Sequence, residues 1–224
     1  MRRFLRENGL SVFFAGLFLF ALVGQAVAGK AEFNSQQVVR GLDAVSLLQY
    51  IATSDFAVDV TENWQSEYLQ FLLYICATVW LVQRGSPESK ELGKSGPESD
   101  EDQMVGAHAK PDSPLWARVG GARTAVYSNS LALIMGALFL LSWLTQSIAG
   151  WSAYNQRQLG DLQPSVSWPA YLVSPEFWSR TLQNWQSEFL AVGSMTVLSI
   201  YLRQRGSPES KPVGETHDST GVTG

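Results

Sequence analysis

The chain has 224 residues, of which 46% are hydrophobic and only 16% are charged. Soluble domains carry about 25% charged residues, so this composition argues against an ordinary soluble globule and indicates a small polytopic membrane protein. The net charge of −4 excludes a protein that binds nucleic acid through its overall charge, and the single cysteine excludes an internal disulfide and a multi-cysteine metal site.

Four transmembrane helices are predicted along the chain. A bilayer core of about 30 Å needs about 20 helical residues, and the first and third candidate spans, residues 10–29 and 130–150, meet this length outright. The second and fourth, residues 64–84 and 185–205, have shorter apolar cores with tryptophan at one end and arginine at the other. These flanking residues suit the two membrane interfaces, so the predicted fold class is an all-α membrane protein with four spans.

The first span also has features of a secretory signal peptide, because three arginines and an apolar run precede the small residues at 26–28. An internal repeat decides between the two interpretations. The sequence aligns with itself without a gap at an offset of 121 residues, and the first span then corresponds to the internal third span. We therefore expect the first span to be retained.

The repeat is clearest in two motifs. One motif reads Asn-Trp-Gln-Ser-Glu and occupies residues 63–67 and 184–188, and the other reads Gly-Ser-Pro-Glu-Ser-Lys and occupies residues 85–90 and 206–211. Each copy of the repeat contains two spans, so both copies insert in the same orientation. This predicts two tandem parallel hairpins related by a pseudo-twofold axis along the membrane normal.

The predicted domain organisation follows from the repeat. The first two-helix repeat covers residues 1–90 and the second covers residues 122–211. The polar composition of residues 91–121 predicts a flexible cytoplasmic linker, and that of residues 212–224 a disordered tail. Twelve lysines and arginines lie on the side of the termini and linker, against four in the other two loops, which predicts that both termini are cytoplasmic.

The twin motifs, together with the full-length repeat that carries them, resemble an uncharacterised bacterial membrane family described only as a domain of unknown function. The resemblance implies a multi-pass protein of the bacterial inner (plasma) membrane. It implies no activity, substrate or catalytic residue.

Two glutamates and two glutamines form a candidate polar cluster. Glu67 and Glu188 lie about one turn inside the second and fourth spans, and Gln25 and Gln146 lie at a similar depth on the preceding helices. A carboxylate near hydrocarbon is costly unless it is paired or wetted, so we expect Glu67 to pair with Gln25 and Glu188 with Gln146. The alternative is an outward-facing vestibule that binds a proton, a cation or a small solute. The residues expected at the membrane interface are Asn63, Trp64, Gln65, Asn184, Trp185 and Gln186.

The function predicted from these features is a non-enzymatic accessory, scaffold or envelope-stress component. Its expected partners are the lipid bilayer and a membrane protein or a second copy of the chain, with no nucleic acid. The alternative is a small transporter or permeability factor that uses the Glu/Gln cluster. We predict no catalytic residue, metal or cofactor, because no nucleophile with a base and no metal-ligand set converges at one depth and both histidines lie in polar stretches.

Overall fold

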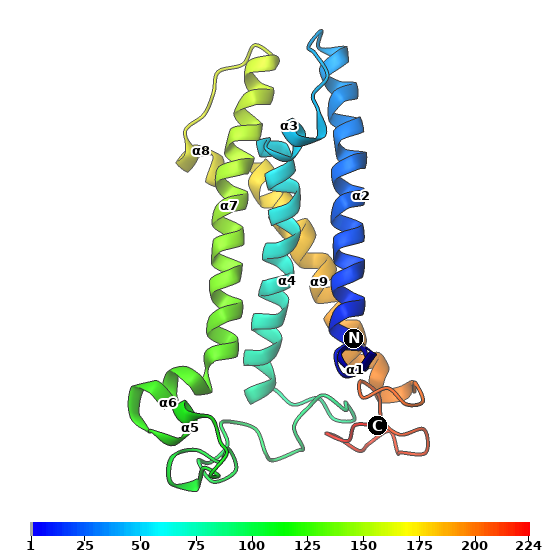
Figure 1. The fold of residues 1–224 in the computed structure, drawn as a ribbon, viewed down its shortest axis with the longest axis vertical. Helices are drawn as coiled ribbons and strands as arrows, with labels where there is room; N and C mark the ends of the chain where they lie inside the picture. Colours follow the sequence, from blue (N-terminus) through cyan, green and yellow to red (C-terminus); the bar gives the residue numbers. More distant parts are fainter. Residues whose placement is uncertain (1) are drawn as a thin grey trace. The chain divides into compact units, whose positions relative to one another are not determined.

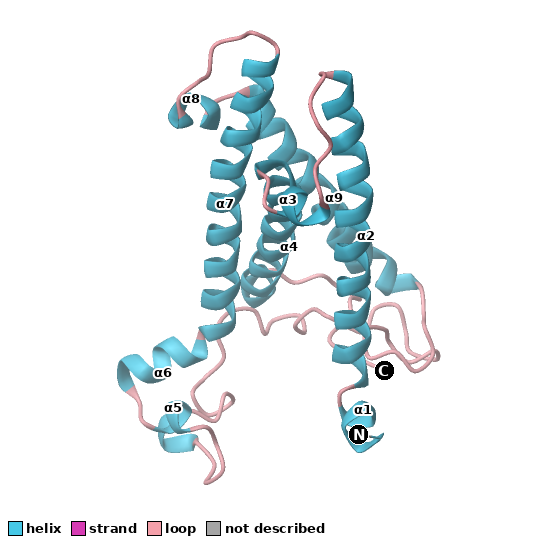
Figure 2. Cartoon of the chain, turned by 45° about the horizontal axis from the view of Figure 1, so that its top comes forward, coloured by secondary structure: helices cyan, strands magenta, loops and turns pink. Residues whose placement is uncertain are grey.

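The computed structural model describes residues 2–224 and consists of helices joined by loops (Figure 2). Four helices are long (Figure 1): α2 (Gly9–Val39), α4 (Ser54–Trp80), α7 (Ser130–Gly160) and α9 (Pro175–Tyr201). The short elements are α1 (Arg2–Glu7), α3 (Leu47–Ile51), the 3-10 turn η1 (Gly106–His108), α5 (Leu115–Arg118), α6 (Gly121–Ser128) and α8 (Trp168–Leu172). The all-α class predicted from the sequence is confirmed.

The helix bounds recur at a constant spacing. Helices α7, α8 and α9 begin and end 121 residues after α2, α3 and α4, which is the offset at which the sequence aligns with itself. The short helices α3 and α8 begin in the same way, because Ser46 Oγ accepts a hydrogen bond from the Gln49 amide and Ser167 Oγ accepts one from the Ala170 amide. Similar residues at these positions therefore produce helices with the same limits.

The bounds of the long helices differ from those of the predicted spans. Helix α2 continues to Val39, through the polar residues that follow the apolar run. Helices α4 and α9 begin before the predicted spans 64–84 and 185–205 and also end before them. Helix α4 begins at Ser54, where Thr53 Oγ1 accepts a hydrogen bond from the Phe56 amide at 3.2 Å. It ends at Trp80, before the arginine predicted to close the span. Apolar composition thus locates a helix but does not set its ends.

Two of the described helices, α2 and α7, are long and apolar enough to cross a membrane by length and composition. Each has 31 residues. Helices α4 and α9 carry more polar residues and do not pass the same test.

The chain forms two compact units. The first comprises the residues up to Thr61 together with Thr145–Phe177, and its small apolar core contains Val58, Ala149 and Ala153. The second comprises Glu62–Leu144 and Trp178–Gly224. Polar side chains are among the most deeply buried in the second unit: Gln65, Ser66 and Thr181.

Large apolar side chains lie on the outside of the long helices. Phe20 and Leu10 on α2 are 80% and 74% exposed, and Trp80 on α4 is 64% exposed. Exposed apolar patches are typical of surfaces that contact a membrane or another protein.

The C-terminal tail contacts both Gly-Ser-Pro-Glu-Ser-Lys loops within the second unit. The Gly85 amide donates to Thr220 Oγ1 at 2.8 Å, the Gly221 amide donates to Ser86 O at 3.0 Å, and the Gly224 amide donates to Ser210 O at 2.8 Å. Composition does not reveal these contacts, because backbone groups make most of them. The disorder expected from composition stays a prediction.

Candidate functional site

Two asparagine side chains form hydrogen bonds with the loops that follow α2 and α7. Asn34 Nδ2 donates to Val45 O at 3.0 Å, and the Val45 amide donates to Asn34 Oδ1 at 2.8 Å. Asn155 and Val166 make the same two hydrogen bonds at the same distances. Each asparagine therefore satisfies both polar groups of one loop residue and holds that loop against its helix.

Two tyrosines pack over glycines of the long helices in the first unit. Tyr50 lies over Gly29 and Tyr171 over Gly150, so closely that a Cβ added at either glycine would overlap the tyrosine hydroxyl. Both tyrosines are buried, and Tyr171 is only 1% exposed. Burial, followed by the charges of Asp59 and Asp55, raises the pKa of Tyr50, so this phenol stays neutral at physiological pH.

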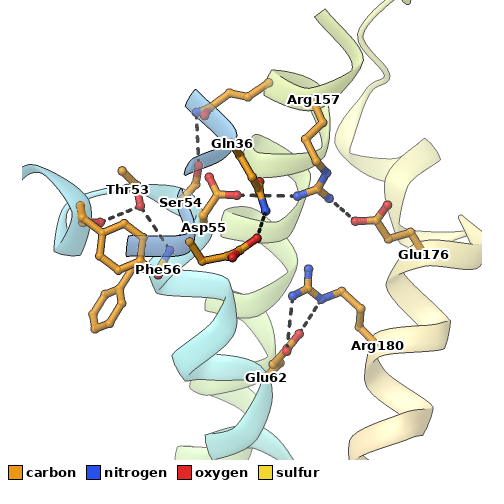
Figure 3. A network of polar contacts seen from close by, with 12 residues as sticks. Gln36, Thr53, Ser54, Asp55, Phe56, Glu62, Arg157, Glu176 and Arg180 are labelled. Atoms are coloured by element: carbon orange, nitrogen blue, oxygen red, sulfur yellow. Dashed lines mark hydrogen bonds and ion pairs between the residues drawn. The ribbon is translucent and has the colours of Figure 1, made fainter. Parts of the chain in front are cut away.

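Arg157 on α7 joins two helix starts within the first unit (Figure 3). Its Nη2 pairs with Glu176 in the first turn of α9, and its Nη1 lies 3.7 Å from Asp55 Oδ1 in the first turn of α4. The positive end of each helix dipole also stabilises these carboxylates. The neighbouring Gln156 donates to Ser54 Oγ at 3.2 Å, which adds a second polar contact to the start of α4.

The Arg157 arrangement is asymmetric. Asp55 and Glu176 stand 121 residues apart, but the residue 121 positions before Arg157 is Gln36, which donates to Glu32 at 3.0 Å (Figure 3). A single arginine, Arg157, therefore forms ion pairs with both carboxylates.

We expect Arg157→Gln to lower the free energy of unfolding by about 1–2 kcal/mol, because it leaves two carboxylates without their cation. The effect is smaller than for a buried pair because the Arg157 side chain is 33% exposed. Thermal and denaturant unfolding in detergent at low and high salt measures it, and salt should reduce the difference. The control is Arg3→Gln, whose ion pair with Glu7 is exposed (90% for Arg3) and should contribute nothing measurable. Equal effects of the two variants would contradict this role of Arg157.

A buried glutamine joins α4 to α9 in the second unit. Trp185 Nε1 donates to Gln65 Oε1 at 2.8 Å, and Gln65 Nε2 donates to Glu62 O at 3.0 Å. Beside this contact, Arg180 Nε donates to Glu62 Oε2 at 2.6 Å (Figure 3). Gln65 and Trp185 come from the two copies of the Asn-Trp-Gln-Ser-Glu motif. The sequence analysis placed both residues at the membrane interface but did not predict a contact between them.

The predicted Glu/Gln cluster is divided between the units. Glu67 is exposed and Glu188 is half-buried, and the two side chains, both in the second unit, interact electrostatically. Gln25 is half-buried and Gln146 is buried, and both belong to the first unit. The predicted pairs of Gln25 with Glu67 and of Gln146 with Glu188 join different units and stay predictions.

The remaining motif residues differ in burial. Asn63, Trp64 and Gln186 are exposed, whereas Asn184 is half-buried and donates to Arg180 O at 3.0 Å.

A second polar group, not predicted from the sequence, lies in the second unit. The Tyr74 hydroxyl donates to the Glu88 carboxylate. A hydrogen bond with Glu88, then the Glu88 charge and then slight desolvation raise the pKa of Glu209, which is exposed. These residues border a cavity of about 440 Å³. The available signal was that Glu88 and Glu209 hold the same position in the two Gly-Ser-Pro-Glu-Ser-Lys motifs.

The same two motifs make the same serine contact but place their lysines differently. Ser89 Oγ accepts from the Gln83 amide and Ser210 Oγ from the Gln204 amide, both at 2.9 Å. The Lys211 ammonium donates to three backbone carbonyls between 2.9 and 3.2 Å, those of Thr216, His217 and Ser219. Burial, followed by the Arg203 charge, lowers the pKa of Lys211.

The side chains that the structure describes, those of residues 3–224, include no group of three or more His, Cys, Asp or Glu that could hold a metal ion. Cys76, the single cysteine, is exposed on α4.

These features define an all-α protein with several long helices, two of which are long and apolar enough to span a membrane. The chain belongs to the family described as a domain of unknown function (DUF6766), whose model matches residues 1–222. No curated protein and no solved structure matches the chain.

Proposed function

We propose that the chain is a four-span protein of the bacterial inner membrane that acts as a non-enzymatic accessory or scaffold subunit. In this proposal two tandem parallel hairpins form the fold, both termini are cytoplasmic, and lipid, a membrane protein and a second copy of the chain are the partners to test.

The distribution of side chains supports four spans. Apolar residues such as Phe71, Leu73 and Trp80 lie exposed on α4, whereas Gln65 and Ser66 of the same helix are buried. A helix that faces lipid on one side and polar groups on the other has a lower average hydropathy than a helix that faces lipid all round. This explains why α4 and α9 can cross a bilayer as parts of a bundle although their average composition is less apolar.

Contacts that recur 121 residues apart support the tandem hairpins. This spacing relates the helix bounds of the two halves. It also relates the hydrogen bonds of Asn34 to those of Asn155, and the tyrosine packed over Gly29 to the one packed over Gly150. Each is a local interaction that a duplicated sequence would reproduce in both copies.

One observation carries the scaffold role: the polar side chains that occur in both halves hold the fold. Asn34 and Asn155 fasten loops, and Ser89 and Ser210 cap the residues after α4 and α9. Their recurrence therefore has a structural reason that needs no catalysis.

Topology mapping tests the four spans. Reporter fusions after Lys90 and at the C-terminus should read cytoplasmic, and fusions near Asn34 and Asn155 should read external, because of the twelve-to-four bias in basic residues. A mature protein that begins at Gly29 would contradict the retained first span.

Isolation of the protein from its native membrane tests the scaffold role. The full chain, tagged at its C-terminus and extracted in mild detergent, should run on native gels as a complex with a companion of fixed stoichiometry or with a second copy. Deletion of residues 91–121 should release a companion that binds the cytoplasmic linker. A chain that runs alone under all extraction conditions would contradict this role.

The second candidate, a small transporter, is favoured by the approach of Glu67 to Glu188 within the second unit. If these carboxylates carry protons or cations, proteoliposomes containing the protein should show flux that Glu67→Gln with Glu188→Gln abolishes while the protein stays folded.

Under the scaffold proposal, the same double variant changes no flux and keeps most of the stability. Glu→Ala at both positions should then be the more destabilising change, by about 1 kcal/mol for each hydrogen bond lost. Flux and melting temperature measured on both variants distinguish the two functions, with the wild-type protein and empty liposomes as references.

A further inference from the structure

The cavity in the second unit has the size and lining of a small-molecule site. Its volume of about 440 Å³ falls in the range of about 300–1,000 Å³ that ligand sites occupy. Helix α4 contributes Phe71 and Tyr74, and α9 contributes Val192 and Met195. The two Gly-Ser-Pro-Glu-Ser-Lys loops contribute Glu88 and Glu209.

The lining combines an apolar wall with negative charge. Phe71, Val192 and Met195 offer an aromatic ring, a branched chain and a thioether, all of which pack against an apolar body. Glu88 and Glu209 interact with each other and also line the cavity, and no lysine or arginine is among its lining residues.

The motifs' own lysines are engaged elsewhere. Lys90 donates to Gly96 O at 2.8 Å and pairs with Glu98 at 3.2 Å, and Lys211 donates to three carbonyls of the tail. Neither motif lysine therefore neutralises the carboxyl groups of Glu88 and Glu209. A positively charged ligand would complement this charge.

We propose that this cavity binds a small amphipathic organic cation, with its apolar body between Phe71, Val192 and Met195 and its positive group at Glu88 and Glu209. The aromatic faces of Phe71 and Tyr74 add cation–π attraction. This site goes beyond the scaffold role, and it does not depend on transport through Glu67 and Glu188.

The experiment uses the full chain purified in detergent and tetraphenylphosphonium as the probe. Titration calorimetry should show saturable binding at one site per chain. Triphenylphosphine oxide, a neutral molecule of related shape, measures the contribution of apolar contact alone and should bind at least about tenfold more weakly.

Matched variants locate the site. Glu88→Gln with Glu209→Gln should weaken tetraphenylphosphonium binding about tenfold or more. Glu91→Gln, which removes one negative charge from the same loop at an exposed pair with Lys94, should leave binding unchanged. Val192→Trp keeps both carboxyl groups but fills the cavity, so it should abolish binding even if the double glutamine variant fails to fold.

Three results would overturn the proposal. These are equal affinity for the charged and neutral probes, wild-type binding by the double glutamine variant, and wild-type binding by Val192→Trp. The first would reduce the cavity to an apolar crevice that detergent or lipid fills, and the others would place the bound cation elsewhere.

Discussion

Gln65→Ala should lower the free energy of unfolding by about 2–3 kcal/mol, whereas Gln186→Ala should change it by less than about 0.5 kcal/mol. Gln65 is 0% exposed, and its amide accepts from Trp185 Nε1 and donates to Glu62 O. Alanine leaves the indole N–H without this acceptor and opens a void between α4 and α9, so the costs of a lost hydrogen bond and a cavity combine.

Gln186 is a matched control, because it is the same residue at the same place in the second Asn-Trp-Gln-Ser-Glu motif but is exposed. Denaturant unfolding of both variants in detergent, followed by tryptophan fluorescence, measures the difference. Trp185→Phe should reproduce part of the Gln65→Ala loss, and the double variant should cost less than the sum of the two. Equal losses at Gln65 and Gln186 would show that the buried contact does not stabilise the fold.

The helices were largely predictable because their signals are local. Apolar runs located α2 and α7, and serine caps fix the starts of α3 and α8. The ends were less predictable, since hydropathy reports where apolar residues stop and not where helical hydrogen bonding stops.

The contacts between helices were not predictable from one sequence. Gln65 and Gln186 occupy identical motifs, yet only the first is buried, and no local property of the motif distinguishes them. The predicted partner of Glu67 was chosen by depth along the helix axis. Depth does not say which helix faces which, and within the second unit Glu67 interacts electrostatically with Glu188.

The carboxyl pair at the cavity was missed for a different reason. Arginine, glycine and proline near residues 84–90 are fully explained by helix termination, so Glu88 needed no further role. Its contacts with Tyr74 and Glu209 depend on how the loop folds back against α4 and against the loop 121 residues later. The only signal of this contact in the sequence is that a glutamate occupies the same position in both motifs.

Gly150→Ala should destabilise the protein by about 1–3 kcal/mol, although alanine is the better helix former. An added Cβ would overlap the Tyr171 hydroxyl and lie 3.1 Å from its Cζ. Tyr171 cannot move aside easily, because it is 1% exposed and packs against Tyr154 and Phe177. Gly193→Ala on α9 is the control, since nothing lies within 4 Å of its added Cβ, and it should be neutral or stabilise by up to about 1 kcal/mol.

The decisive variant combines Gly150→Ala with Tyr171→Phe. Removing the hydroxyl removes the atom that the new methyl group overlaps, and the ring then needs to shift by only a few tenths of an ångström. The double variant should therefore regain most of the stability lost by Gly150→Ala, whereas Tyr171→Phe alone should cost less than about 1 kcal/mol. Gly29→Ala with Tyr50→Phe should behave in the same way, because the same overlap occurs there. Additive losses in both double variants would mean that the glycines are required for some reason other than room for the tyrosine hydroxyls.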